Sequence, residues 1–166
     1  MRYSDGPSVE VEVRVEATPQ RVWDLVSDIE MPARFSDEFL EARWLDAGPA
    51  VGARFVGRNR HEAMGEWETT SFVVRYEPPR RFEWAVTDPE TPSTLWWFDL
   101  EPIGDDAVRL RQGTRFGPGR SGLNFAIDAM PDKEERIIAR RLQEHERNMQ
   151  ATLEGIKHLA ETEARS

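Results

Sequence analysis

The C-terminal segment constrains the fold of this chain more than any other. Residues 132–163 contain one glycine and no proline, and apolar residues recur at alternating steps of three and four. Pro131 precedes this run, and Glu134 and Glu135 near its start would oppose the positive end of a helix dipole. The pattern predicts one helix on the order of 45 Å long, enough to cross a complete domain.

The region before this helix is patterned mainly as strands. Four valines between Val9 and Val15 alternate with charged residues, which is typical of a strand with one buried and one solvent-facing side. Thr18 and Pro19 then provide a cap and a first turn, and apolar residues at helical spacing continue towards Pro32. We therefore expect a first strand, a short helix and a second helical turn near residues 33–37.

Six further strands are expected after this turn. Glycine- and proline-rich breaks separate segments that show the period of two expected for strands. The connections are too short for crossover helices, so the strands should form an antiparallel meander. The expected strands span residues 41–46, 53–61, 66–76, 81–87, 94–101 and 107–116.

Alternation within each strand also predicts which side chains face inward. Arg54, Arg58 and Arg60 share one parity and should face water, so the residues between them should face the core. In the strand at 66–76, Trp67 and Phe72 have opposite parity, and each belongs to a set of candidate inward residues. A β-bulge in this strand would reconcile the two sets.

Composition excludes several classes of protein. A chain of 166 residues with 39% hydrophobic residues can bury one substantial core, and we expect one domain over residues 1–166. The charge of −9 disfavours nucleic-acid binding. The chain has no cysteine and no apolar run of about 20 residues, so we expect a soluble cytoplasmic protein that does not insert into membranes.

Motifs for metals and nucleotide cofactors are poorly represented. The three histidines are far apart in sequence and no HExxH motif occurs, so we expect no metal and no cofactor. Residues 117–122 match the spacing GxGxxG, but they lie in a long connection and not in a βαβ unit. We expect residues 117–130 to form a loop that overhangs a cavity as a lid.

The order of elements and several short stretches resemble the START/Bet v1-like (SRPBCC) superfamily, and most closely its bacterial polyketide cyclase/dehydrase-like proteins. The resemblance covers residues 9–160 and departs from many relatives at Phe35, where they have tryptophan. The matching stretches are Val15-Glu16-Ala17-Thr18-Pro19, Val22-Trp23 with Asp28, Gly52-Ala53-Arg54-Phe55 with Gly57 and Asn59, Arg81-Phe82, Leu100-Glu101-Pro102, and Asn148-Met149 with Leu153 and Ile156.

The resemblance implies an α+β helix-grip fold. In that fold a seven-stranded curved antiparallel sheet surrounds the long C-terminal helix, and two short helices follow strand one. Sheet and helix together enclose a cavity for an apolar small molecule. Members bind lipids, hormones or polyketides, some catalyse cyclisation, and others assist protein partners. No catalytic motif of a characterised cyclase maps onto this chain residue by residue.

His145 is the strongest single candidate for a site residue, because it interrupts the apolar face of the long helix between Leu142 and Met149. It could contact a ligand or act as an acid or base. The alternative is a buried histidine that bonds a strand hydroxyl or a backbone carbonyl.

Other inward positions of the strands complete the candidate ligand site. Polar groups among apolar ones often orient a ligand, and the alternative is that they bond one another. Aromatic residues could line a cavity or simply pack in the core. No lysine or arginine of the strands has inward parity, which favours a neutral or phenolic ligand over a carboxylate. The helix candidates are Leu142, His145 and Met149, and the strand candidates are Asn59, Trp67, Thr69, Ser71, Trp84, Trp96, Phe98, Gln112 and Thr114.

Three functions remain open from sequence. The first is binding of a hydrophobic aromatic or polycyclic small molecule in an internal cavity. The second is catalysis by a polyketide cyclase, aromatase or dehydratase with His145 as acid or base. The third is a protein-interaction module that uses the outer sheet face or Trp97. The sequence predicts no oligomeric state.

Overall fold

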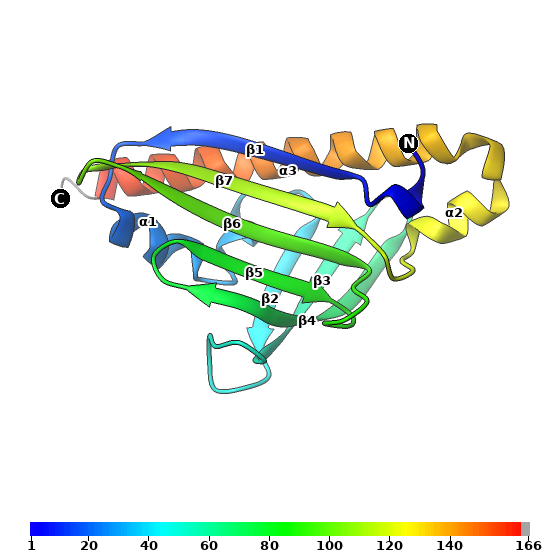
Figure 1. The fold of residues 1–166 in the computed structure, drawn as a ribbon, viewed down its shortest axis with the longest axis horizontal. Helices are drawn as coiled ribbons and strands as arrows, with labels where there is room; N and C mark the ends of the chain where they lie inside the picture. The colour runs from blue at the N-terminus through cyan, green and yellow to red at the C-terminus, as the bar shows by residue number, and fades with distance from the viewer. Residues whose placement is uncertain (164–166) are drawn as a thin grey trace.

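The computed structural model describes residues 1–163, which contain one seven-stranded antiparallel sheet in the order β1-β7-β6-β5-β4-β3-β2 (Figure 1). The predicted meander is thus confirmed, with each strand paired to its sequence neighbour except that β1 closes against β7. The strands are β1 (Ser8–Val15), β2 (Phe39–Trp44), β3 (Arg54–His61), β4 (Gly65–Glu77), β5 (Arg81–Val86), β6 (Thr94–Ile103) and β7 (Ala107–Phe116).

The predicted long helix is confirmed as α3 (Glu134–Glu163). The first short helix is capped as expected, since the Thr18 hydroxyl accepts from the Arg21 amide at 3.2 Å. The second short helix begins slightly earlier than expected. The remaining helices are α1 (Pro19–Val26), α2 (Leu123–Ala129) and the 3₁₀ turns η1 (Tyr3–Asp5), η2 (Met31–Arg34) and η3 (Pro131–Lys133). None of the helices in residues 1–163 is both long and apolar enough to cross a bilayer.

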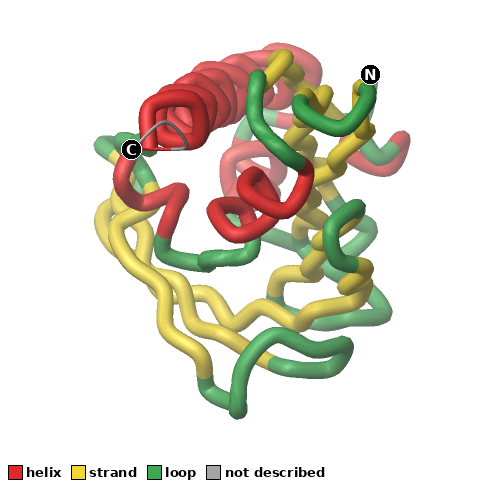
Figure 2. The backbone as a smooth tube through the Cα atoms, turned by 90° about the vertical axis from the view of Figure 1, so that its left-hand side faces the viewer, coloured by secondary structure: helices red, strands yellow, loops and turns green. Residues whose placement is uncertain are grey.

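The sheet curls around α3, which lies along β1 and β7 on the concave side (Figure 2). The side chains of Met149, Leu153 and Ile156 on α3 are fully buried in the main core. This arrangement confirms the helix-grip fold. Because α3 packs on one half of a curved sheet, the other half stands away from it.

The bulge expected in the fourth strand is present. The pairing of β4 with β5 shifts register between Val73 and Arg75. Before the shift Ser71 and Val73 are buried, and after it Tyr76 packs against Phe82 with ring centres 5.7 Å apart. The odd-numbered set up to Val73 therefore faces the core, and of the other set only Tyr76, which follows the shift, does so.

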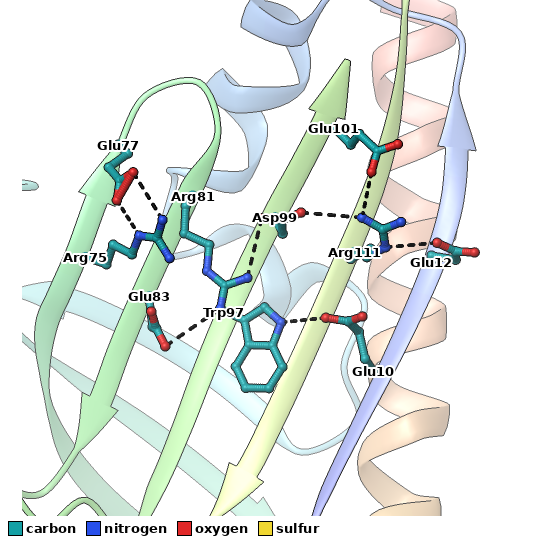
Figure 3. A network of polar contacts seen from close by, with 10 residues as sticks. All are labelled: Glu10, Glu12, Arg75, Glu77, Arg81, Glu83, Trp97, Asp99, Glu101 and Arg111. Carbon is teal, nitrogen blue, oxygen red and sulfur yellow. Dashed lines mark hydrogen bonds and ion pairs between the residues drawn. The ribbon is translucent and has the colours of Figure 1, made fainter. Parts of the chain in front are cut away.

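The convex face of the sheet carries a network of opposite charges (Figure 3). Arg111 on β7 pairs with Glu12 on β1 and with Asp99 and Glu101 on β6, and Arg81 pairs with Asp99. Exposed pairs of this kind contribute about 0–1 kcal/mol each. Their main effect is to keep this face polar.

Trp97, the aromatic residue considered above as a contact for a protein partner, lies within this network and is not free. Its indole Nε1 donates to Glu10 at 2.8 Å, and the Arg81 guanidinium lies 5.2 Å from its ring centre. The indole also covers Gly113, where an added Cβ would lie 2.2 Å from the ring. Trp97 thus shields the backbone of β7 and offers a partner protein little uncovered apolar surface.

Gly155, the one glycine of the long helix, and Phe35, the departure from many relatives, contact each other. The Phe35 ring follows η2 and lies across α3 where Gly155 leaves room. A Cβ at Gly155 would lie 2.4 Å from two atoms of that ring. This contact holds η2 against the helix.

We expect Gly155→Ala to destabilise the protein by about 1–3 kcal/mol because the new methyl group overpacks against Phe35. Helix propensity alone predicts the opposite change, about 1 kcal/mol of stabilisation. Urea unfolding of Gly155→Ala in the wild type and in a Phe35→Ala background distinguishes the two effects. Stabilisation by Gly155→Ala in both backgrounds would contradict the contact.

Candidate functional site

Two adjacent chambers with shared lining residues lie between α3 and the far half of the sheet. The inner chamber has a volume of about 120 Å³ and is lined by residues that include Phe55, Trp84, Phe98 and Gln112. The outer chamber has a volume of about 880 Å³ and is lined by residues that include Trp67, Ser93 and Leu123. The residues shared by both linings are Glu38, Asn59, Thr69, Val86, Trp96 and His145.

Most of the candidate residues read from the sequence lie at this cavity. Strand parity brings them together because the inward faces of β3 to β7 converge on the space beneath α3. Trp67 lines only the outer chamber. The inner chamber is lined by Asn59, Thr69, Ser71, Trp84, Trp96, Phe98, Gln112, His145 and Met149.

Two candidates do not line either chamber. Leu142 packs with a separate cluster formed by Tyr3, Phe116 and Ile127, because the first turns of α3 face this cluster and not the cavity. Thr114 faces inward as predicted but is fully buried outside the two linings.

The segment between α1 and β2 forms a wall that the sequence analysis missed. Ile29, Pro32 and Ser36 line the inner chamber, and Phe39 closes it beside β3. The Phe39 ring lies over Gly57, where an added Cβ would be 2.9 Å from the ring. Helical spacing marked Ile29 as apolar, but no periodic pattern extends through this irregular segment.

A cluster of four charged or titratable side chains lies at the cavity, and we call it the Glu38–Arg141 cluster. Arg141 on α3 donates from both terminal nitrogens to the two oxygens of Glu38, at 2.7 and 2.6 Å. Arg141 also donates to Glu144 at 3.3 Å, and His61 Nε2 lies 2.8 Å from Glu144. Both carboxylates are thus paired and largely shielded from solvent, with 13% of the Glu38 side chain and 21% of the Glu144 side chain exposed.

Hydrogen bonds fix the protonation pattern of this cluster. Burial acts to raise the pKa of Glu144, but hydrogen bonds from His61 and Arg141 and the charge of Arg141 outweigh it and lower that pKa. The amide of Ala63 donates to His61 Nδ1 at 3.0 Å, so His61 Nε2 carries the proton that is donated to Glu144. The cluster joins the β1–β2 connection, β3 and α3 across the mouth of the cavity.

His145 is buried, with 6% of its surface exposed, and faces both chambers. Its ring meets Trp96 edge-on at 5.0 Å and Phe116 at 5.7 Å. Nothing in residues 1–163 hydrogen-bonds the ring, so the expected alternative, a bond to a strand hydroxyl or backbone carbonyl, is absent there. Burial, reinforced by Arg141 and His61, lowers the pKa of His145 well below 6.5. The imidazole is therefore neutral at pH 7 and offers one donor and one acceptor.

The connection at residues 117–130 lies at the outer chamber, as expected for a lid, but it contains α2 and is not all loop. Leu123 and Phe125 line the chamber, and Phe125 is 80% exposed. The Tyr3 hydroxyl donates to the Gly119 carbonyl at 2.7 Å and so ties the N-terminal segment to this connection. Although a helix does follow the glycines, the adjacent strands are antiparallel, so the dinucleotide fingerprint does not apply.

We expect acid to destabilise the wild type more than a His145→Gln variant. In the unfolded chain His145 takes up a proton near pH 6.5, whereas the folded ring resists protonation until a lower pH. Stability is therefore complete above pH 6.5 and is lost as the pH falls towards the folded pKa. Urea unfolding between about pH 5.5 and 7.5 measures this difference, with the exposed His158→Gln as the control. Equal pH slopes for wild type and His145→Gln would contradict it.

Comparison with known proteins identifies the family. The family described as polyketide cyclase/dehydrase and lipid transport matches residues 6–161. A polyketide cyclase-like protein from Corynebacterium glutamicum is 34% identical, with 96% of this chain and 94% of that chain covered and a TM-score of 0.66. The ZhuI aromatase/cyclase from Streptomyces has the same fold at 18% identity, with 97% of each chain covered and a TM-score of 0.67. No curated protein matches the chain in sequence. With nearly its whole length matched, the chain belongs to the polyketide cyclase/dehydrase and lipid transport family.

Proposed function

We propose that this protein binds a hydrophobic, aromatic or polycyclic small molecule in the two chambers between α3 and the sheet. The observation that carries the proposal is an unfilled space with aromatic walls. Trp84 packs edge-on against Phe82 at 5.2 Å and lies 6.0 Å from both Phe55 and Phe98. All four rings line the inner chamber and leave about 120 Å³ unfilled. A dry apolar cavity of about 150 Å³ holds benzene.

The charges around the cavity support a neutral ligand. Glu38 is a partly buried carboxylate of the inner lining, and both of its oxygens accept hydrogen bonds from Arg141. Glu38 in turn neutralises Arg141, so the guanidinium group is not available to bind a ligand carboxylate. The family description, which names polyketide cyclases and lipid transport, supports an apolar ligand on independent grounds.

Tryptophan fluorescence titrated with a panel of aromatic compounds tests this proposal. We expect saturable quenching, because Trp84 and Trp96 line the inner chamber. Trp96→Phe and Trp84→Phe should each reduce the quenching. Trp97→Phe on the outer face is the matched control and should leave the ligand-dependent change intact. A flat response across the panel would contradict the proposal.

A second function, cyclisation of a polyketide-like substrate, is favoured by the state of His145. A buried neutral imidazole without a partner in the described chain can accept a proton from a bound substrate. His145 would remove a proton from a methylene group between two carbonyls, and the enolate would attack a ketone carbon of the same chain. The resulting alkoxide would take that proton back. Departure of this hydroxyl with a second proton as water would form the ring double bond.

His145→Ala separates the two functions. If the protein is a cyclase, the variant should bind a short poly-β-ketone thioester within a few fold of wild type but lose turnover. The readout is the appearance of a product lighter by one water in mass spectrometry. Equal turnover by His145→Ala and wild type would exclude His145 as the acid or base, and turnover by neither protein would leave binding as the function.

A further inference from the structure

Two polar side chains beneath the sheet are buried without partners. Gln112 is 4% exposed and Thr114 0% exposed, and they occupy successive inward positions of β7. Within residues 1–163, neither Gln112 Oε1 nor the Thr114 hydroxyl has a hydrogen-bond partner. A buried polar atom that has left water without gaining a partner reduces stability.

The cross-strand neighbours of these side chains do not satisfy them. Gln112 lies between Val11 on β1 and Phe98 on β6, and both are apolar. Thr114 lies in the same way between Val9 and Trp96. The Gln112 side chain does line the inner chamber.

His145 is a second polar side chain at the inner chamber, beside Gln112. Its ring contacts Trp96, the cross-strand neighbour of Thr114. An amide, a hydroxyl and a neutral imidazole share one property, because each can both donate and accept a hydrogen bond. None of them carries a charge that would attract an ion.

We propose that the inner chamber recognises the hydroxyl group of a neutral aromatic ring, and that Gln112 is the residue that selects it. This inference rests on the proposed function and specifies its ligand class. A phenolic hydroxyl donates and accepts, so it matches the amide whichever way the amide is turned. A carboxylate only accepts and would need a cation, and Arg141 is already held by Glu38.

The volumes of the two chambers indicate where the rest of the ligand lies. The inner chamber can hold about one ring, by comparison with the benzene-binding cavity of about 150 Å³. Trp96 and His145 border both chambers, so a fused second ring would pass between them into the outer chamber. The hydroxylated ring enters first and the remainder stays near the mouth.

Three probes of one shape test the inference by equilibrium dialysis: 2-naphthol, 2-methylnaphthalene and 2-naphthoate. Wild type should bind 2-naphthol about tenfold more tightly than the methyl compound, as expected for one hydrogen bond made in an apolar site, and should bind the carboxylate most weakly. Gln112→Met keeps the side-chain volume and removes the amide, so the preference for the hydroxyl should fall to about twofold or less. Gln143→Met, on the exposed side of α3, is the matched control and should retain the full preference.

Thermal unfolding without ligand gives a second readout. Removing an unpaired buried amide should raise the Tm of Gln112→Met by about 2–4 °C, because the wild type carries this group at a cost in stability. If Gln112→Met does not fold, Thr114→Val offers an isosteric removal of the other unpaired group and should also raise the Tm.

The outcomes separate the inference from the proposed function. Equal binding of 2-naphthol and 2-methylnaphthalene by wild type would overturn the inference and leave hydrophobic binding intact. A hydroxyl preference that persists in Gln112→Met would overturn the assignment of Gln112. Failure of wild type to bind any of the three probes would contradict the proposed function itself.

Discussion

The structure depends on how the curved sheet holds α3. Residues such as Leu153 and Ile156 bury one stripe of the helix against the half of the sheet that contains β1 and β7. A sheet that twists and curls cannot stay in contact with a straight helix across all of its strands. The space left under the remaining strands is where the chambers form, so the cavity follows from the geometry of the fold.

Other contacts keep that space from closing or opening further. Phe35 packs against Gly155 and holds the segment between α1 and β2 against the helix. The ion pair of Glu38 with Arg141 attaches the same segment to α3. Aromatic rings on β3, β5 and β6 pack against one another in edge-on and tilted contacts and form a stiff floor. Walls built in this way leave a preformed site, which a ligand can enter without reorganising the core.

Local patterns in the sequence predicted most of the fold and many of the cavity residues. Alternation in β1 and β7 and the helical spacing of α3 each describe a single element, and the conflict between Trp67 and Phe72 was enough to indicate the bulge. The pairs that join distant elements could not be predicted in this way. Glu38 and Arg141 lie far apart in sequence, and their contact exists only because the sheet has curled. The short helix α2 was missed because it is bounded by glycines and prolines that resemble a loop.

The same limit applies to the chemistry of the site. Strand parity placed Gln112 and Thr114 on the inward side, and helical spacing did the same for His145. Neither pattern could distinguish a satisfied polar group from an unpaired one, because that depends on the neighbouring elements. Leu142 was assigned to the cavity since it shares the apolar stripe with Met149, yet the stripe is longer than the cavity and its first turns cover the cluster near Tyr3.

The central claim is that helix and sheet leave an unfilled apolar chamber. A crystal structure of the protein under xenon pressure tests it most directly, because xenon occupies dry apolar cavities. The account predicts xenon density in the inner chamber against Trp84 and Phe98 with the surrounding side chains unmoved. Side chains that fill the chamber, with no xenon between α3 and the sheet, would contradict it.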